Sequence, residues 1–204
     1  MSRFSEYIGS QFGNPRGIFG VVCCLIMNTI NKAMYKRTVA LMDVPQGEKV
    51  LDIGYGNGYL LKLLDKACKA NLYGIDISAD MQSLAMKKNK SAVQEGRMHL
   101  CVGDCCNLPY EDENFAAVTS INTVYFWRDT LKGLQEIKRC LKHGSCFYNV
   151  VYTKKWLDTL SYTEKGFKKF EPEQLAQLGY EAGFADVEVQ EIVKEKSFVV
   201  VYKK

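Results

Sequence analysis

Hydrophobic residues along the chain change their spacing near residue 54. Residues 50–53 form a short run that is apolar except for Asp52, which is typical of a buried strand. A turn with glycines at alternate positions follows, and behind it leucines recur with the period of a helix, at positions 60, 61, 63 and 64. The pattern predicts a strand, a glycine turn and a helix in direct succession.

The same change of period recurs along the chain to residue 151. Apolar runs typical of strands lie at 71–76, 98–102, 114–121 and 146–151, and helical patterns lie at 79–94 and 129–141. Strands that alternate with helices predict a mostly parallel sheet with helices on both faces. We therefore expect an α/β fold of three layers, in which the carboxyl ends of the strands meet at one edge.

Both ends of the chain extend this pattern. Residues 1–17 contain Gly9, Gly13, Asn14, Pro15 and Gly17, which indicates a loop. Residues 18–42 carry a helical pattern that predicts one or two helices. Near the C-terminus, Glu171 and Pro172 mark the start of a helix that runs to about residue 182. Two strands are predicted after it, at 187–193 and 198–202.

Length and composition fit one soluble domain of 204 residues. The net charge of +4 is too small to predict a nucleic-acid partner. The eight cysteines form no C-x-x-C pair and lie mostly in apolar segments, so we expect reduced thiols in a cytoplasmic protein. The apolar stretch from Ile18 to Met27 is too short to span a bilayer, so a buried or lid helix is expected there and not membrane insertion.

The glycine turn is suited to a polar small molecule. Glycines let the backbone adopt positive φ angles, and the helix that follows offers N–H groups and the positive end of its dipole. A dinucleotide fold would place a glycine where this chain has Tyr59. The spacing acidic-x-Gly-x-Gly-x-Gly, from Asp52 to Gly58, instead resembles motif I of the class I S-adenosylmethionine (SAM) methyltransferases. A glycine turn without a ligand is the alternative.

Further segments extend this resemblance over residues 48–151. YGIDIS, GDCCNLPYEDENFAAV and LKHGS look like motifs II and III, the strand-four signature and the turn after it in the methyltransferase type 11 group. The resemblance implies a Rossmann-like, seven-stranded sheet of order 3-2-1-4-5-7-6 with the last strand antiparallel. His143, Ser145 and Tyr55 depart from the residues usual in the family.

The resemblance also implies how the single domain is divided. Residues 1–45 would form an N-terminal helical lid, and residues 46–151 a SAM-binding core. Residues 152–204 would supply a substrate-side segment and the closing strand pair.

The cofactor residues are expected at the ends of the first strands. The Asp76 carboxylate can accept both hydroxyls of a ribose, and Asp104 can accept from an adenine amino group beside the amide of Cys105. Plain turn roles are the alternatives. The resemblance implies the same two carboxylates and adds Ile77 against the adenine and Asn122 near the aminoacyl end. The cofactor-binding candidates are Asp52, Gly54, Tyr55, Gly56, Gly58, Asp76, Ile77, Asp104, Cys105 and Asn122.

The acceptor site is expected beside the end of the fourth strand. Tyr125 is the candidate catalytic residue, which would orient or deprotonate an acceptor, and aromatic packing is the alternative. Candidates for acceptor binding are aromatic or amide side chains, which suggest a small, partly apolar acceptor: Asn28, Asn31, Tyr35, Phe126, Trp127 and Trp156. Asn28, Asn31 and Tyr35 are spaced to share one helical face.

The spacing of histidine, cysteine and acidic residues predicts no metal site. A metalloid acceptor held by Cys101, Cys105 and Cys106 is a further alternative.

Together these features predict methyl transfer from SAM to a small molecule, with S-adenosylhomocysteine as product. SAM carries its own activation, so the protein must chiefly align the acceptor and exclude water. Two other functions stay open. One is an RNA or protein methyltransferase that docks through Lys154, Lys155, Lys165, Lys168 and Lys169. The other is a SAM-binding regulatory protein without catalysis. The sequence predicts no oligomeric state.

Overall fold

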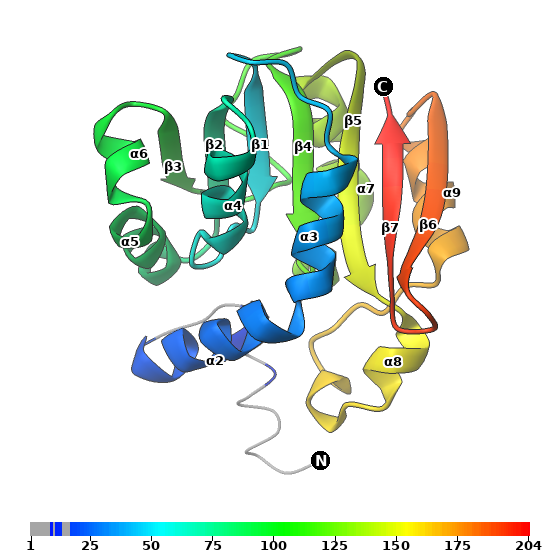
Figure 1. The fold of residues 1–204 in the computed structure, drawn as a ribbon. Helices are drawn as coiled ribbons and strands as arrows, with labels where there is room; N and C mark the ends of the chain where they lie inside the picture. The colour runs from blue at the N-terminus through cyan, green and yellow to red at the C-terminus, as the bar shows by residue number, and fades with distance from the viewer. Residues whose placement is uncertain (1–8, 10, 14–16) are drawn as a thin grey trace.

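The computed structural model describes residues 9, 11–13 and 17–204 (Figure 1). Within them, seven strands form one sheet in the order β3-β2-β1-β4-β5-β7-β6. The strands are β1 (Lys49–Ile53), β2 (Asn71–Asp76), β3 (Met98–Val102), β4 (Phe115–Ile121), β5 (Leu141–Tyr152), β6 (Asp186–Val193) and β7 (Ser197–Lys203). β7 runs antiparallel to β5 and β6, and the other neighbours pair in parallel. The expected strand order is confirmed.

Helices cover both faces of this sheet. In Figure 1, α3 and α4 lie in front of it, and α7 and α9 lie behind it, so the expected three layers are present. The helices are α2 (Gly17–Ile30), α3 (Lys32–Leu41), α4 (Tyr59–Ala67), α5 (Ala79–Lys88), α6 (Lys90–Gln94), α7 (Thr130–Cys140), α8 (Lys154–Asp158) and α9 (Pro172–Glu181), with 3-10 turns η1 (Val124–Phe126) and η2 (Ser161–Thr163). None of the described helices combines the length and apolar character that a membrane span needs.

Alternate residues of β1 belong to two hydrophobic clusters, one on each face of the sheet. Val50 packs with Leu61 of α4 on one face, whereas Leu51 packs with Ile137 of α7 on the other. A central parallel strand covered on both faces needs apolar side chains on both, which explains the continuous run in the sequence. Asp52 is a buried carboxyl within it.

The N-terminal helical pattern is interrupted at Asn31, which separates α2 from α3. Residues 9 and 11–13 are helical, although their glycines predict a loop. Packing explains the glycine at position 9, since a side chain there would collide with the carbonyl oxygen of Tyr162. The rest of the predicted N-terminal loop, residues 1–8, 10 and 14–16, lies outside the described residues.

Two further predicted boundaries differ from the structure. The helix predicted at 79–94 is broken at Asn89, whose buried amide donates to the carbonyl oxygens of Gly58 and Ala85 at 3.1 and 3.0 Å. The turn predicted before the fifth strand is part of β5, which begins at Leu141 opposite Phe115 and continues past an irregularity in the pairing with β4.

Figure 1 shows the arrowheads of β1, β4 and β5 pointing toward α2 and α8. The residues that follow these strands therefore lie on the side of the sheet where α2 and α8 are found. This is the edge of the sheet at which the sequence predicts a site.

Candidate active site

A cavity of about 410 Å³ lies at the carboxyl ends of the strands. This volume falls in the range of small-molecule sites. All the cofactor and acceptor candidates predicted from the sequence line it except Gly58. The lining candidates are Asn28, Asn31, Tyr35, Asp52, Gly54, Tyr55, Gly56, Asp76, Ile77, Asp104, Cys105, Asn122, Tyr125, Phe126, Trp127 and Trp156.

The three glycines of the turn have different surroundings, although all have positive φ angles. A Cβ on Gly54 would lie 2.3 Å from the Thr123 side chain, so this glycine lets β1 approach the turn after β4. Gly56 borders the cavity and has no atom within 4 Å of its Cβ position, so it offers bare backbone. Gly58 instead packs against Asn89 and Ala85 at the start of α4, away from the cavity lining.

Asp76 is held in place by two backbone groups. Its carboxylate accepts hydrogen bonds from the N–H of Gly56 at 2.8 Å and from the N–H of Ser78 at 2.9 Å. Burial raises the pKa of Asp76, and these bonds oppose the rise. A carboxylate oxygen has more than one lone pair, so a fixed Asp76 can still accept from a ligand.

Asp52 is more deeply buried and lies on the cavity wall, only 3% exposed. It accepts a hydrogen bond from the hydroxyl of Thr119 at 3.0 Å. Desolvation by burial, with a smaller contribution from Asp76, raises the pKa of Asp52 to about 7. The site therefore contains a carboxyl group that changes its charge near neutral pH.

Tyr55 and Ile77 differ in how they contribute to the wall. The Tyr55 ring is buried, and its hydroxyl donates to the carbonyl oxygen of Cys101 on β3 at 3.1 Å. Ile77 is 53% exposed and presents apolar surface just after β2. Ile77 therefore suits a flat, apolar ligand group better than Tyr55 does.

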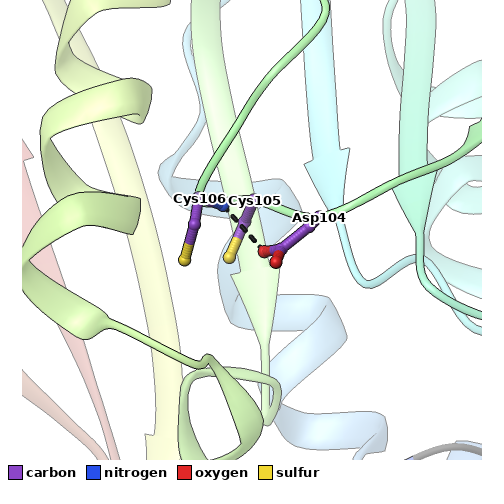
Figure 2. Close-up of side chains that lie close together, drawn as sticks. All are labelled: Asp104, Cys105 and Cys106. Carbon is purple, nitrogen blue, oxygen red and sulfur yellow. Dashed lines mark hydrogen bonds between the residues drawn. The ribbon is translucent and has the colours of Figure 1, made fainter.

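Asp104, Cys105 and Cys106 lie side by side on the loop after β3 (Figure 2). The Cys106 N–H donates to the Asp104 carboxylate at 2.8 Å, and the Arg128 guanidinium lies 3.9 Å from the other carboxylate oxygen. Their possible metal-ligand atoms fall within 4.8 Å of one another, a grouping that the sequence spacing does not predict. Burial raises the pKa of both thiols, which opposes the thiolate form that metals prefer.

Tyr125 is buried and belongs to a network of hydrogen bonds. Its hydroxyl donates to the side-chain oxygen of Asn122 at 3.0 Å and accepts from the Tyr152 N–H at 2.6 Å. The Asn122 amide and the Tyr152 hydroxyl both donate to the side-chain oxygen of Asn31, at 3.2 and 2.6 Å. Burial raises the pKa of Tyr125 well above its usual value. This geometry favours the orienting role over deprotonation of an acceptor.

The polar residues from the N-terminal helices do not share one helical face, because Asn31 separates α2 from α3. They still meet at the cavity. The Tyr35 hydroxyl donates to Asn28, and the Asn28 amide donates to Asn57, each at 3.5 Å.

Aromatic rings form the other side of the cavity. Phe126 packs edge-on against Phe167 with ring centroids 4.6 Å apart, and Trp156 also lines the wall. Trp127 is 5% exposed and donates to the Thr123 hydroxyl at 3.0 Å, so its role is largely structural.

Tyr152 is a lining residue that the sequence analysis missed. The rule that ligands meet the carboxyl ends of strands could have identified it, since Tyr152 ends β5.

The lysines considered as a docking patch are engaged within the chain. Lys154 and Lys169 pair with Asp158, and Lys155 pairs with Glu195. Lys168 donates to the backbone carbonyl oxygens of Trp127 and Arg128, and Lys165 also has a partner. This surface is not an array of free positive charges.

A family model described as a methyltransferase domain matches residues 51–149, which include the glycine turn and the acidic strand ends. Over these residues the chain belongs to this methyltransferase family, and the order of its sheet is that of the class I SAM-dependent methyltransferase fold.

Individual relatives agree with this family. The chain is 28% identical over 166 residues to an uncharacterised methyltransferase of Bacillus subtilis (strain 168), covering 81% of this chain and 87% of that protein. It is 27% identical over 146 residues to a ubiquinone/menaquinone biosynthesis C-methyltransferase of Geobacter sp. (strain M21), covering 71% of this chain and 62% of that one.

Among solved structures, a chain of the complex between the Haloferax volcanii Trm112 methyltransferase activator and a methyltransferase superposes with a TM-score of 0.76. The two chains are 21% identical, and the match covers 100% of this chain and 98% of that one. The likeness shows that the described part of this chain shares its fold with that protein.

Proposed function

We propose that this protein transfers a methyl group from SAM to a small, partly apolar acceptor. The observation that carries the proposal is one cavity that joins two surfaces. A glycine turn and acidic strand ends form one side, and aromatic rings form the other. The first surface suits the cofactor and the second suits the acceptor.

The residues of the first surface fit SAM. Gly56 leaves space for a ligand to lie on the main chain, and Asp76 is a fixed acceptor for ribose hydroxyls. Ile77 offers apolar surface to the adenine, with Asp104 and Cys105 at its edge. SAM supplies an activated methyl group on its sulfonium, so the chain must hold and align its ligands and exclude water.

The second surface favours an acceptor with an apolar body. Phe126, Trp156 and Phe167 line it together with Leu157 and Leu160. Such a wall binds apolar groups and disfavours an unpaired charge.

Tyr125 acts there as a positioning group that holds Asn122 toward the acceptor. The names of several relatives, which refer to ubiquinone/menaquinone biosynthesis and to 24-methylenesterol, support an apolar acceptor.

The test is incubation of the purified protein with methyl-labelled SAM and separate aqueous and lipid extracts. We expect labelled product in the organic phase and an equal amount of S-adenosylhomocysteine. Asp76→Ala is the matched negative control, because it removes the ribose acceptor. Failure to bind S-adenosylhomocysteine at millimolar concentration would overturn the proposal. Binding without turnover on any extract would instead support the regulatory function.

A further inference from the structure

Helix α2 is apolar on two faces, and its 14 residues include no charged side chain. Cys23 and Met27 on the inner face line the cavity. The outer face carries apolar side chains that are about half exposed: Val22 (46%), Leu25 (55%), Ile26 (53%) and Ile30 (47%). This spacing places them on one stripe of the helix. A contiguous exposed apolar stripe marks an interaction surface.

Lysines gather along one side of this stripe. A shallow depression beside α2 is lined by Leu25 together with Lys32, Lys62, Lys66 and Lys88. Lys32, Lys62 and Lys66 are exposed. The depression therefore combines an aliphatic surface with a concentration of positive charge.

This combination matches the chemistry of an anionic bilayer. Aliphatic side chains can enter the boundary between head groups and acyl chains, while lysines keep their charges among the phosphates. A protein interface fits less well, because lysine is depleted at such interfaces. A nucleic acid would leave the aliphatic residues without a partner.

We propose that the outer face of α2 docks on a bilayer surface that carries anionic phospholipids. The same docking would place the apolar wall of the cavity next to a source of lipid-soluble acceptor. Ile30 contributes to both surfaces, since it is exposed and also lines the cavity. The supply of acceptor from the bilayer rests on the proposed function. The docking of α2 on the bilayer does not depend on that function.

The test is flotation of the full chain with vesicles of phosphatidylcholine alone or mixed with phosphatidylglycerol. We expect binding to the mixed vesicles that weakens as salt is added. Lys62→Glu/Lys66→Glu should lower the vesicle partition coefficient by roughly tenfold or more, because it reverses two surface charges. Leu25→Glu/Ile26→Glu should reduce it similarly by placing carboxylates in the apolar stripe.

Val189→Glu/Val193→Glu is the matched control, since it places charges on two exposed apolar residues of β6. This variant should bind vesicles like the wild type. Binding of S-adenosylhomocysteine, measured by calorimetry for every variant, shows that each is folded and tests the cofactor site separately.

The docking proposal would be overturned if the floated fraction contained the same amount of wild-type protein with and without vesicles. An equal loss of binding in the β6 control would also overturn it. A third contrary result would be that the α2 or lysine substitutions change the oligomeric state measured by light scattering, while the wild type does not bind vesicles. The surface would then bind a second copy of the chain. Normal cofactor binding beside any of these results would leave the proposed function standing.

Discussion

The backbone N–H of Gly56 lies 2.8 Å from a carboxylate oxygen of Asp76 and donates a hydrogen bond to it. This bond joins the glycine turn after β1 to the end of β2. It fixes the carboxylate at the cavity before any ligand arrives, which lowers the entropic cost of binding.

Replacement of Asp76 by alanine should weaken binding of S-adenosylhomocysteine by more than tenfold. Each lost charge-assisted hydrogen bond is worth about 1.5–3 kcal/mol. Isothermal calorimetry measures the change. Asp186→Ala is the control, because Asp186 is an exposed acid whose carboxylate bonds to the N–H of its neighbour Val187. Similar affinities for the two variants would contradict the ribose role of Asp76.

Gly56→Ala tests the bare backbone of the turn. Gly56 and Gly144 both have positive φ angles and open space at the Cβ position, but Gly144 lies away from the cavity lining. Alanine should therefore destabilise the fold by about 1–2 kcal/mol at either position. Only Gly56→Ala should also lose affinity for S-adenosylhomocysteine. Thermal unfolding and calorimetry separate the two effects, and equal affinities would show that no ligand approaches Gly56.

Asp52 should make stability depend on pH. Its pKa of about 7 in the folded state lies above the ordinary value of 3.8, so the folded protein favours the protonated form. The folded state therefore binds the extra proton between these values, and stability falls as pH rises from about 4 to 7. The loss is on the order of 4 kcal/mol for a shift of this size.

Asp52→Asn removes this titration and keeps the shape of the side chain. The free energy of unfolding, measured in urea from pH 4 to pH 8, should fall with pH in the wild type more than in the variant. The difference between the two proteins should therefore grow in favour of the variant up to about pH 7 and stay constant above it. Asp76 is present in both proteins, so the difference reports the titration of Asp52 together with its coupling to Asp76. Parallel stability curves would mean that folding does not shift the pKa of Asp52.

Tyr125→Phe distinguishes positioning from base catalysis. The variant keeps the ring but loses the hydrogen bond to Asn122 and the one accepted from the Tyr152 N–H, so kcat/KM for the acceptor should fall about fivefold to tenfold. The pH profile should keep its shape, because a phenol with so high a pKa stays protonated in the wild type. A general base would contribute about 10²–10⁴-fold. A loss of that size together with a changed pH profile would restore the base role.

Much of the core of the site could be predicted because it depends on local patterns. The apolar pattern of residues 50–53 predicts β1, and parallel strands bring the acids near the carboxyl ends of β1 and β2 to one edge. Asp52 and Asp76 therefore meet at the cavity as expected. The order of the last strands came from the family resemblance, since no local pattern distinguishes 7-6 from 6-7.

Contacts between distant residues could not be predicted. The break at Asn31 depends on hydrogen bonds to Asn122 and Tyr152, and nothing in the helical period around residue 31 marks it. The packing role of Gly58 depends on Asn89 in the same way, because the close approach of α4 and α5 is a tertiary feature.

The amide oxygen of Asn31 also has a thermodynamic consequence. It receives hydrogen bonds from groups at the ends of β4 and β5, so any displacement of α2 about this residue is felt at the acceptor side of the cavity. If the acceptor and a docking surface stabilise the same placement of α2, each tightens the binding of the other by the same factor.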